Sequence, residues 1–250
     1  MTGSTRTAIR LAAAGTALAA LSMGGTALAG TGAGAGTGGT AQASGGTGPV
    51  ATAGLTGQDT GDTGAVRIPR NFLLHEARAR GPVRYPGEEK WTIRDGVRGP
   101  LEVELCGPRR PADTGRVAAR AVVHEAPEHR SAEQLVIYRS AGSARRAMAG
   151  LLAHAGRCAR VRTEGMVVKT RVDPVRAGDR AARISVQGYD AGGVRPAVGG
   201  QRTVVVRRDR ALAIYTLAGE YGRVRGSDFT RPLKDAERMA ARVCSLPGLC

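Results

Sequence analysis

Residues 203–217 have the sequence TVVVRRDRALAIYTL, in which two apolar runs stand on either side of a charged segment. The runs Thr203–Val206 and Ala211–Leu217 are rich in β-branched and aliphatic residues, and Arg207–Arg210 between them has the polar composition of a turn. The pattern predicts a β-hairpin. Both runs are apolar on both faces, which is typical of strands inside a sheet, so we expect helices to cover one face and other residues the second.

Further extended segments are predicted on both sides of this hairpin. Leu101–Cys106 alternates apolar and polar side chains with period two, which indicates a half-buried strand. Val117–His124 and Gln134–Tyr138 are joined by the polar segment Glu125–Ser131, which contains a proline, and are predicted to form a second hairpin. Two more segments, Val161–Val172 and Ala181–Gln187, are predicted to be extended. Gly188–Gly200, which follows them, is predicted to be a loop.

Three helices complete the predicted set. The clearest is Ser140–Gly156, in which alanine, leucine and methionine recur at helical spacing, with Ser140 or Ser143 as N-cap and Gly156 as C-cap. A shorter helix is predicted over Asn71–Arg80, and a C-terminal helix from near Thr230. Helices and hairpins in this order predict an α+β fold, with helices packed on a mostly antiparallel sheet.

The N-terminal quarter of the chain has the composition of an export signal and a linker. Residues 1–29 combine a basic start with a short apolar stretch, which predicts a signal peptide cleaved between Ala29 and Gly30. Residues 30–65 are rich in Gly, Thr and Ala, and we expect a disordered linker. Residues 66–250 then form a single globular domain. The mature protein is expected to be secreted or extracytoplasmic, with no transmembrane span.

The four cysteines fit an oxidising compartment. In an exported domain of this size, Cys106, Cys158, Cys244 and Cys250 predict two disulfides. We favour pairing Cys106 with Cys158 and Cys244 with Cys250. The alternative joins Cys158 to Cys244 and Cys106 to Cys250.

No catalytic motif is present in the sequence, which favours a non-catalytic binding or sensor-like domain. His124 and His129 stand five apart with Pro127 between them, a poor spacing for zinc, so we expect a charged, solvated turn and no metal site. We expect no cofactor either. Two alternatives stay open: a secreted hydrolase of unknown substrate, whose pocket would join a Ser or paired carboxylates to a histidine, and a structural envelope protein.

The charge of the chain suggests the class of ligand. Thirty-seven basic residues against 21 acidic ones give a net charge of +16, and arginines gather at 202–225. Arginine forks bind carboxylates and phosphates well. Export argues against nucleic acid, so we expect an anionic cell-envelope polymer or lipid headgroups. The candidate ligand-binding residues are Trp91, Tyr138, Arg139, Tyr215, Arg207, Arg208 and Arg210.

In order along the chain, these segments resemble the PknH-like extracellular sensor domain of actinobacterial exported proteins. The resemblance spans roughly residues 90–250. It is carried by the segment ending at Cys106, by SAGSARRA at 140–147 in a helix followed by Cys158, by VVVRRDRALAIYTL at 204–217, and by a last helix before Cys244. It implies an α+β domain with two disulfides and a cleft for an unidentified ligand, and no catalytic residues. The chain departs from the family in having no kinase domain and no lipidated cysteine, and in placing Cys250 last.

Overall fold

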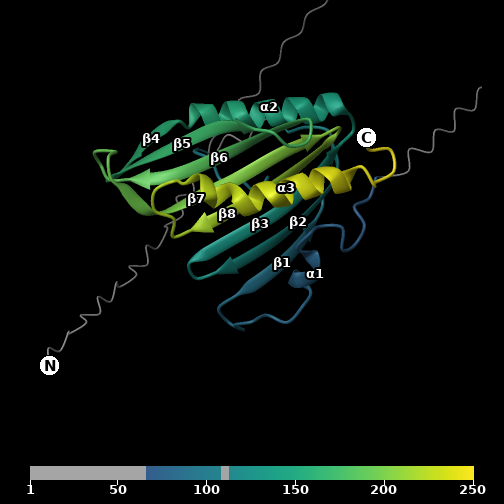
Figure 1. The fold of residues 1–250 in the computed structure, drawn as a ribbon, viewed down its shortest axis with the longest axis horizontal. Coiled ribbons are helices and arrows are strands. Elements are labelled where there is room, and N and C mark those ends of the chain that lie inside the picture. Colours follow the sequence, from purple (N-terminus) through teal and green to yellow (C-terminus); the bar gives the residue numbers. More distant parts are fainter. Residues whose placement is uncertain (1–65, 108–112) are drawn as a thin grey trace, which may run out of the picture. The chain divides into compact units, whose positions relative to one another are not determined.

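The computed structural model describes residues 66–107 and 113–250. The predicted signal peptide, its cleavage site and the predicted linker lie outside these residues. The described chain forms one eight-stranded sheet in the order β1-β2-β3-β8-β7-β6-β5-β4, in which all neighbouring strands are antiparallel (Figure 1). The strands are β1 (Lys90–Asp95), β2 (Arg116–Ala126), β3 (His129–Tyr138), β4 (Arg160–Thr163), β5 (Met166–Val175), β6 (Arg180–Tyr189), β7 (Pro196–Arg208) and β8 (Ala211–Gly219).

The predicted hairpin at 203–217 is present and lies at the centre of the sheet. Its strands β7 and β8 pair from Gly200 with Gly219 to Arg208 with Ala211. Asp209 occupies the turn with a φ of 47°, a left-handed conformation that aspartate tolerates, and its backbone N–H donates to Asp179. The second predicted hairpin is also present, as β2 and β3.

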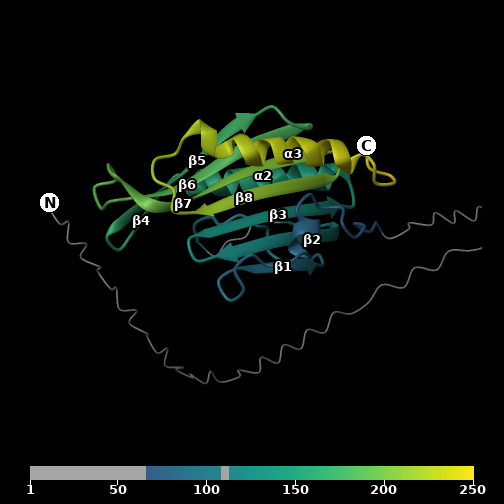
Figure 2. The same cartoon turned by 60° about the horizontal axis from the view of Figure 1, so that its bottom comes forward.

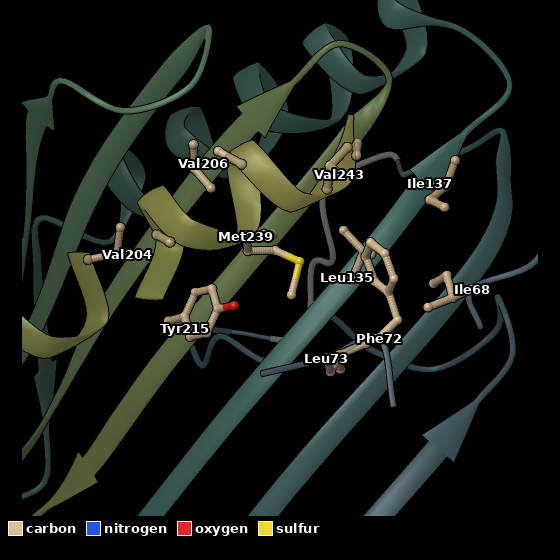
Figure 3. Close-up of a cluster of buried hydrophobic side chains, with 14 of the residues drawn as sticks. Ile68, Phe72, Leu73, Leu135, Ile137, Val204, Val206, Tyr215, Met239 and Val243 are labelled. Atoms are coloured by element: carbon tan, nitrogen blue, oxygen red, sulfur yellow. The ribbon is translucent and has the colours of Figure 1, made fainter. Parts of the chain in front are cut away.

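Each face of the sheet is crossed by a single long helix, as Figures 1 and 2 show together. Helix α3 (Thr230–Val243) lies on the face where Leu135, Val204 and Tyr215 meet Met239 (Figure 3). Helix α2 (Ala141–Arg157) lies on the opposite face, with Val136, Val205, Ile214 and Leu151 among the buried residues there. Because side chains alternate along a strand, consecutive residues of β3 and β7 pack in turn against the α3 side and the α2 side of the sheet. The remaining helical turns are α1 (Glu76–Ala79) and η1 (Gly226–Phe229).

The predicted α+β class is wrong. The fold is mostly β: the sheet is entirely antiparallel, and the helices form no layer on it. One reason for the low helical content is that the helix expected over Asn71–Arg80 is only four residues long in the structure, as α1. Asn71 has a φ of 61°, and the backbone N–H groups of Leu74 and His75 donate to the Glu133 side chain, so the first turns cannot continue as a helix.

The predicted strand at Leu101–Cys106 is also absent. This segment crosses the α2 face, and its backbone is bonded to side chains instead of a neighbouring strand. The Glu102 N–H donates to Gln134 Oε1 at 2.9 Å, and the Glu104 N–H donates to Gln201 Oε1 at 3.1 Å. Its leucines and Val103 still pack against the core of that face.

Smaller boundaries differ as well. The extended segment at Val161–Val172 is split into β4 and β5 by a turn at Glu164 and Gly165, and the loop expected at Gly188–Gly200 is shorter because β7 begins at Pro196. Ser140 caps α2 by accepting from the Ser143 N–H, but Gly156 lies inside the helix and Cys158 is the C-cap. No helix in 66–107 or 113–250 is long and apolar enough to cross a membrane.

Candidate functional site

A cavity of about 220 Å³ opens on the α3 face, between the first turns of α3, the strands β2, β3 and β8, and the segment around α1. Its lining contains three histidines, two carboxylates, the single tryptophan and two arginines. We call it the histidine pocket. These groups are His75, His124, His129, Glu133, Asp235, Trp91, Arg78 and Arg231, together with Ser131 and Tyr215.

The floor of the histidine pocket is the carboxylate of Glu133, which is 2% exposed. Its Oε1 accepts from the Leu74 N–H at 2.8 Å and from the Tyr215 hydroxyl at 2.7 Å, and its Oε2 accepts from the His75 N–H at 2.7 Å. Burial, followed by the charge of Glu133, raises the pKa of Tyr215 well above its usual value of 10.0, so the hydroxyl remains a donor. Three uncharged donors thus hold a buried negative group in one orientation.

One wall of the pocket pairs a histidine with a second buried carboxylate. His75 Nε2 lies 3.2 Å from Asp235 Oδ2, and Asp235 is also 3.9 Å from Arg231 and 3.8 Å from Arg238. Asp235 is 6% exposed and lies in the second turn of α3. Asp235 thus has two exposed arginines within ion-pair distance in addition to His75.

The opposite wall is aromatic. Trp91 on β1 faces His124 on β2, and their rings stack at 4.3 Å with an interplanar angle of 22°. The guanidinium of Arg78 lies 5.5 Å from the centroid of the Trp91 ring, within cation–π distance. His124 is fixed further by Glu89, whose Oε2 is 3.4 Å from Nε2. These contacts hold the aromatic wall in one orientation.

His129 lies next to this wall, and its pKa is lowered. Its ring centroid is 6.0 Å from that of His124. Burial lowers the pKa of His129 below 6.5, and the neighbouring His124 and Arg231 lower it further. We therefore expect His129 to be neutral at pH 7.

The arginines of the pocket lie at its entrance. The side chain of Arg231 is 70% exposed, and Arg78 is exposed as well. Among the described residues, Arg78 makes no ion pair, so its charge is available to a ligand. The pocket thus combines a cationic entrance, an aromatic wall and a hydrogen-bond acceptor at its floor.

The expectation of a solvated turn at His124–His129 is wrong for His124, whose side chain is only 12% exposed and lines the pocket. In residues 66–107 and 113–250, the group with metal-ligand spacing is Cys106, His154 and Cys158, and its two sulfur atoms are bonded to each other. Ser131 lines the histidine pocket, but within the same residues no hydrogen bond joins a serine or paired carboxylates to His124, His129 or His154.

The structure brings two of the sequence-predicted ligand residues, Trp91 and Tyr215, into the histidine pocket. Tyr138 is fully buried in the α2-face core, where its hydroxyl donates to Asp113 at 2.6 Å and burial raises its pKa to about 12. Arg139 lies beside Gly115, to whose carbonyl its own backbone N–H donates. The predicted residues therefore do not form one cluster.

Of the hairpin arginines, Arg207 and Arg208 at the end of β7 are paired within the protein, whereas Arg210 in the turn forms no ion pair among the described residues. Arg207 and Arg208 each form an ion pair with Asp179 at 3.0 Å. Arg202 is completely buried: its Nε donates to Asp228 at 3.0 Å, and Nη2 donates to Gln187 Oε1 at 2.9 Å. Arg202 thus has a structural role in the strand pair.

The cysteines occupy the two favoured pairs. Cys106 is bonded to Cys158, which ties the segment before residue 107 to the end of α2, and Cys244 is bonded to Cys250 after α3. In the part of the chain that the structure describes, no cysteine is free.

Several residues of the pocket were not predicted from the sequence, among them His75, Arg78, Glu133, Arg231 and Asp235. For Glu133 a signal was available, because it stands one residue before the apolar run Gln134–Tyr138 and continues the alternation of Leu135 and Ile137 into the core. A charged residue at such a position has to be satisfied inside the protein. The other residues of this set have no local signal in the sequence.

Comparisons with known proteins give a loose likeness in fold. No protein-family model matches the chain, and no curated protein matches it. Among solved structures, the extracellular domain of PknH from Mycobacterium tuberculosis is 14% identical, with a TM-score of 0.41, over 68% of this chain and 90% of that one. An uncharacterized protein from Mycobacterium smegmatis, the Rv0999 ortholog, is 13% identical, with a TM-score of 0.31, over 63% of this chain and 91% of that one.

Proposed function

We propose that this protein is an exported, non-catalytic, sensor-like binding domain, and that the histidine pocket holds its ligand. The ligand is small, carries a phosphate or carboxylate group, and has hydroxyl groups. Its anionic group binds between Arg78 and Arg231 at the entrance, its ring or chain lies against Trp91, and a hydroxyl donates to Glu133.

The observation that carries this proposal is the preorganised Glu133 carboxylate at the end of a pocket with a cationic entrance. A buried carboxylate is costly unless it is fully hydrogen-bonded, and three donors from separate parts of the chain converge on this one. A volume of about 220 Å³ is below that of typical drug-sized sites, which favours a ligand of monosaccharide size.

Export is supported by the sequence and by the cysteines. Residues 1–29 have the pattern of a signal peptide, and two disulfides are stable in an oxidising compartment. A ligand from outside the cytoplasm is therefore the relevant one.

A thermal-shift panel tests the proposed function. The purified protein is melted with glycerol 3-phosphate and glucuronate, which have the expected chemistry, and with glycerol and glucose, which lack the anionic group. At a ligand concentration of 100 Kd, binding stabilises the native state by about 2.7 kcal/mol, which for a domain of this size raises the Tm by about 5–10 °C. We expect a rise with an anionic member and none with the neutral ones.

The matched variants are R78Q/R231Q, which removes both entrance charges, and R145Q/R146Q, which removes two exposed charges from α2. The first should abolish the shift and the second should leave it unchanged. Equal shifts with anionic and neutral compounds, equal shifts in both variants, or no shift with any member would contradict the proposal.

A further inference from the structure

A second cavity, of about 430 Å³, lies on the sheet between β5, β6 and the segment that leads from β8 into η1. We call it the basic groove. It shares no lining residue with the histidine pocket. Five cationic side chains line it, against one carboxylate: Lys169, Arg171, Arg183, Arg223 and Arg225, with Asp173.

The single carboxylate does not neutralise these cations. Asp173 accepts from Arg171 Nε at 2.8 Å and from Arg183 Nε at 3.3 Å, so it is shared by two arginines. Lys169 donates to the Gly193 carbonyl at 2.7 Å, and its Nζ lies 4.1 Å from the centroid of the Tyr189 ring. These two contacts orient Lys169 without cancelling its charge.

The other side of the groove carries two unpaired arginines. Val224 packs against the α3-face core, and its neighbours Arg223 and Arg225 are exposed. Within the described residues, neither guanidinium forms an ion pair or another side-chain contact to a carboxylate. The apolar side chain of Val224 thus fixes this segment on the core, and the guanidinium groups of Arg223 and Arg225 remain exposed to solvent. This arrangement is expected of an anion-binding surface.

The cations of the groove are spread along it. Lys169 and Arg171 are two residues apart on β5, and the rise of a strand places their backbones about 7 Å apart on the same face. Arg183 pairs across with Asp173 on the neighbouring strand, and Arg223 and Arg225 repeat the spacing of two on the opposite wall. Two rows of charge suit a chain with repeated anionic groups better than a single ion.

We propose that the basic groove binds a linear, phosphate-bearing polymer. Arginine is the residue that pairs with phosphate oxygens through two parallel hydrogen bonds, and four of the five cations are arginines. The polymer lies along β5 and β6, and Arg223 and Arg225 close over it from the other side. This site is distinct from the histidine pocket and from the hairpin arginines Arg207 and Arg208, which pair with Asp179.

Long-chain inorganic polyphosphate is the probe that tests this proposal. Its Kd for the full protein is measured by fluorescence anisotropy of end-labelled polymer, at salt concentrations from 50 to 300 mM. The test variant is R223Q/R225Q, and R145Q/R146Q on α2 is the control, because it removes the same charge from exposed positions elsewhere. Circular dichroism confirms that both variants are folded.

We expect R223Q/R225Q to weaken polyphosphate binding more than tenfold, and R145Q/R146Q to weaken it less than threefold. Each lost phosphate contact should also reduce the slope of log K against log salt by roughly 0.7 to 0.9, because fewer counterions are released. Equal losses in the two variants would mean that only the net charge matters and would overturn the proposal. So would binding of orthophosphate as tight as that of the polymer, or groove-dependent binding of phosphatidylglycerol vesicles tighter than that of polyphosphate. The thermal shifts of the histidine pocket are unaffected by either result.

Discussion

The two disulfides should differ in their contribution to stability, because they close loops of very different length. Cys106 and Cys158 are 52 residues apart, and Cys244 and Cys250 are 6 apart. In the loop-entropy model, cross-linking stabilises the native state by about 4 kcal/mol for the long loop and about 2 kcal/mol for the short one. The fully buried Cys158 adds to the first value, because its side chain also packs in the α2-face core.

The perturbation is the double alanine variant of each pair. For a domain of this size, 1 kcal/mol corresponds to roughly 2–4 °C in Tm. We expect C106A/C158A to melt about 8–16 °C below the wild-type protein and C244A/C250A about 4–8 °C below it. Differential scanning calorimetry under non-reducing conditions measures both. Equal decreases, or a larger one for the short loop, would refute the reasoning from loop length.

Three further perturbations test the buried polar network and the histidine pocket. D228N leaves the buried Arg202 guanidinium without its charged partner and should lower the free energy of unfolding by about 3–5 kcal/mol in urea titrations; a loss below about 1 kcal/mol would argue against a buried pair. Y215F removes a donor from the buried Glu133 carboxylate and should cost about 1–3 kcal/mol in the same assay, whereas no loss would mean that water replaces the hydroxyl. The lowered pKa of His129 means that the unfolded chain binds the proton more tightly. Stability should therefore fall as the pH drops from 6.5 through the lowered pKa, and H129Q should flatten this part of the Tm–pH profile; an unchanged profile would assign the effect to other groups.

The central elements of the fold could be predicted because their signals are local. The hairpin at 203–217 has two strongly apolar runs around a charged turn, and α2 and α3 carry continuous apolar stripes, with Ser140 as the side-chain N-cap of α2. Residues close in sequence decide these elements, so one sequence is sufficient to find them.

The errors occurred where distant residues decide the local structure. Leu101–Cys106 has the alternation of a strand, but its backbone bonds to Gln134 and Gln201, which are up to 97 residues away. The helix expected at Asn71–Arg80 is cut short by Glu133, about 60 residues later. Propensity and periodicity contain no information about such partners, and tertiary contacts override them.

The same limit applies to the site. Trp91 and Tyr215 were found as aromatic residues in a chain with few of them, but the pocket is assembled from segments spread over the whole domain. His75 and Asp235, for example, are 160 residues apart. The charged groups of the pocket have no common spacing in the sequence, so only the folded chain places them together. Arginine clustering at 202–225 likewise did not distinguish the buried Arg202 from the exposed Arg223.

Trp91 allows the most direct test of the proposed binding pocket, because it is the only tryptophan in the chain and lies in the pocket wall. Its fluorescence reports on this site alone, and the stacked His124 makes it sensitive to any movement of the wall. We expect titration with glycerol 3-phosphate or glucuronate to change the emission in a saturable way in the wild-type protein and in R145Q/R146Q, and not in R78Q/R231Q. A flat titration with both compounds, or the same saturable change in R78Q/R231Q as in the wild type, would contradict the assignment of this pocket as an anion-binding site.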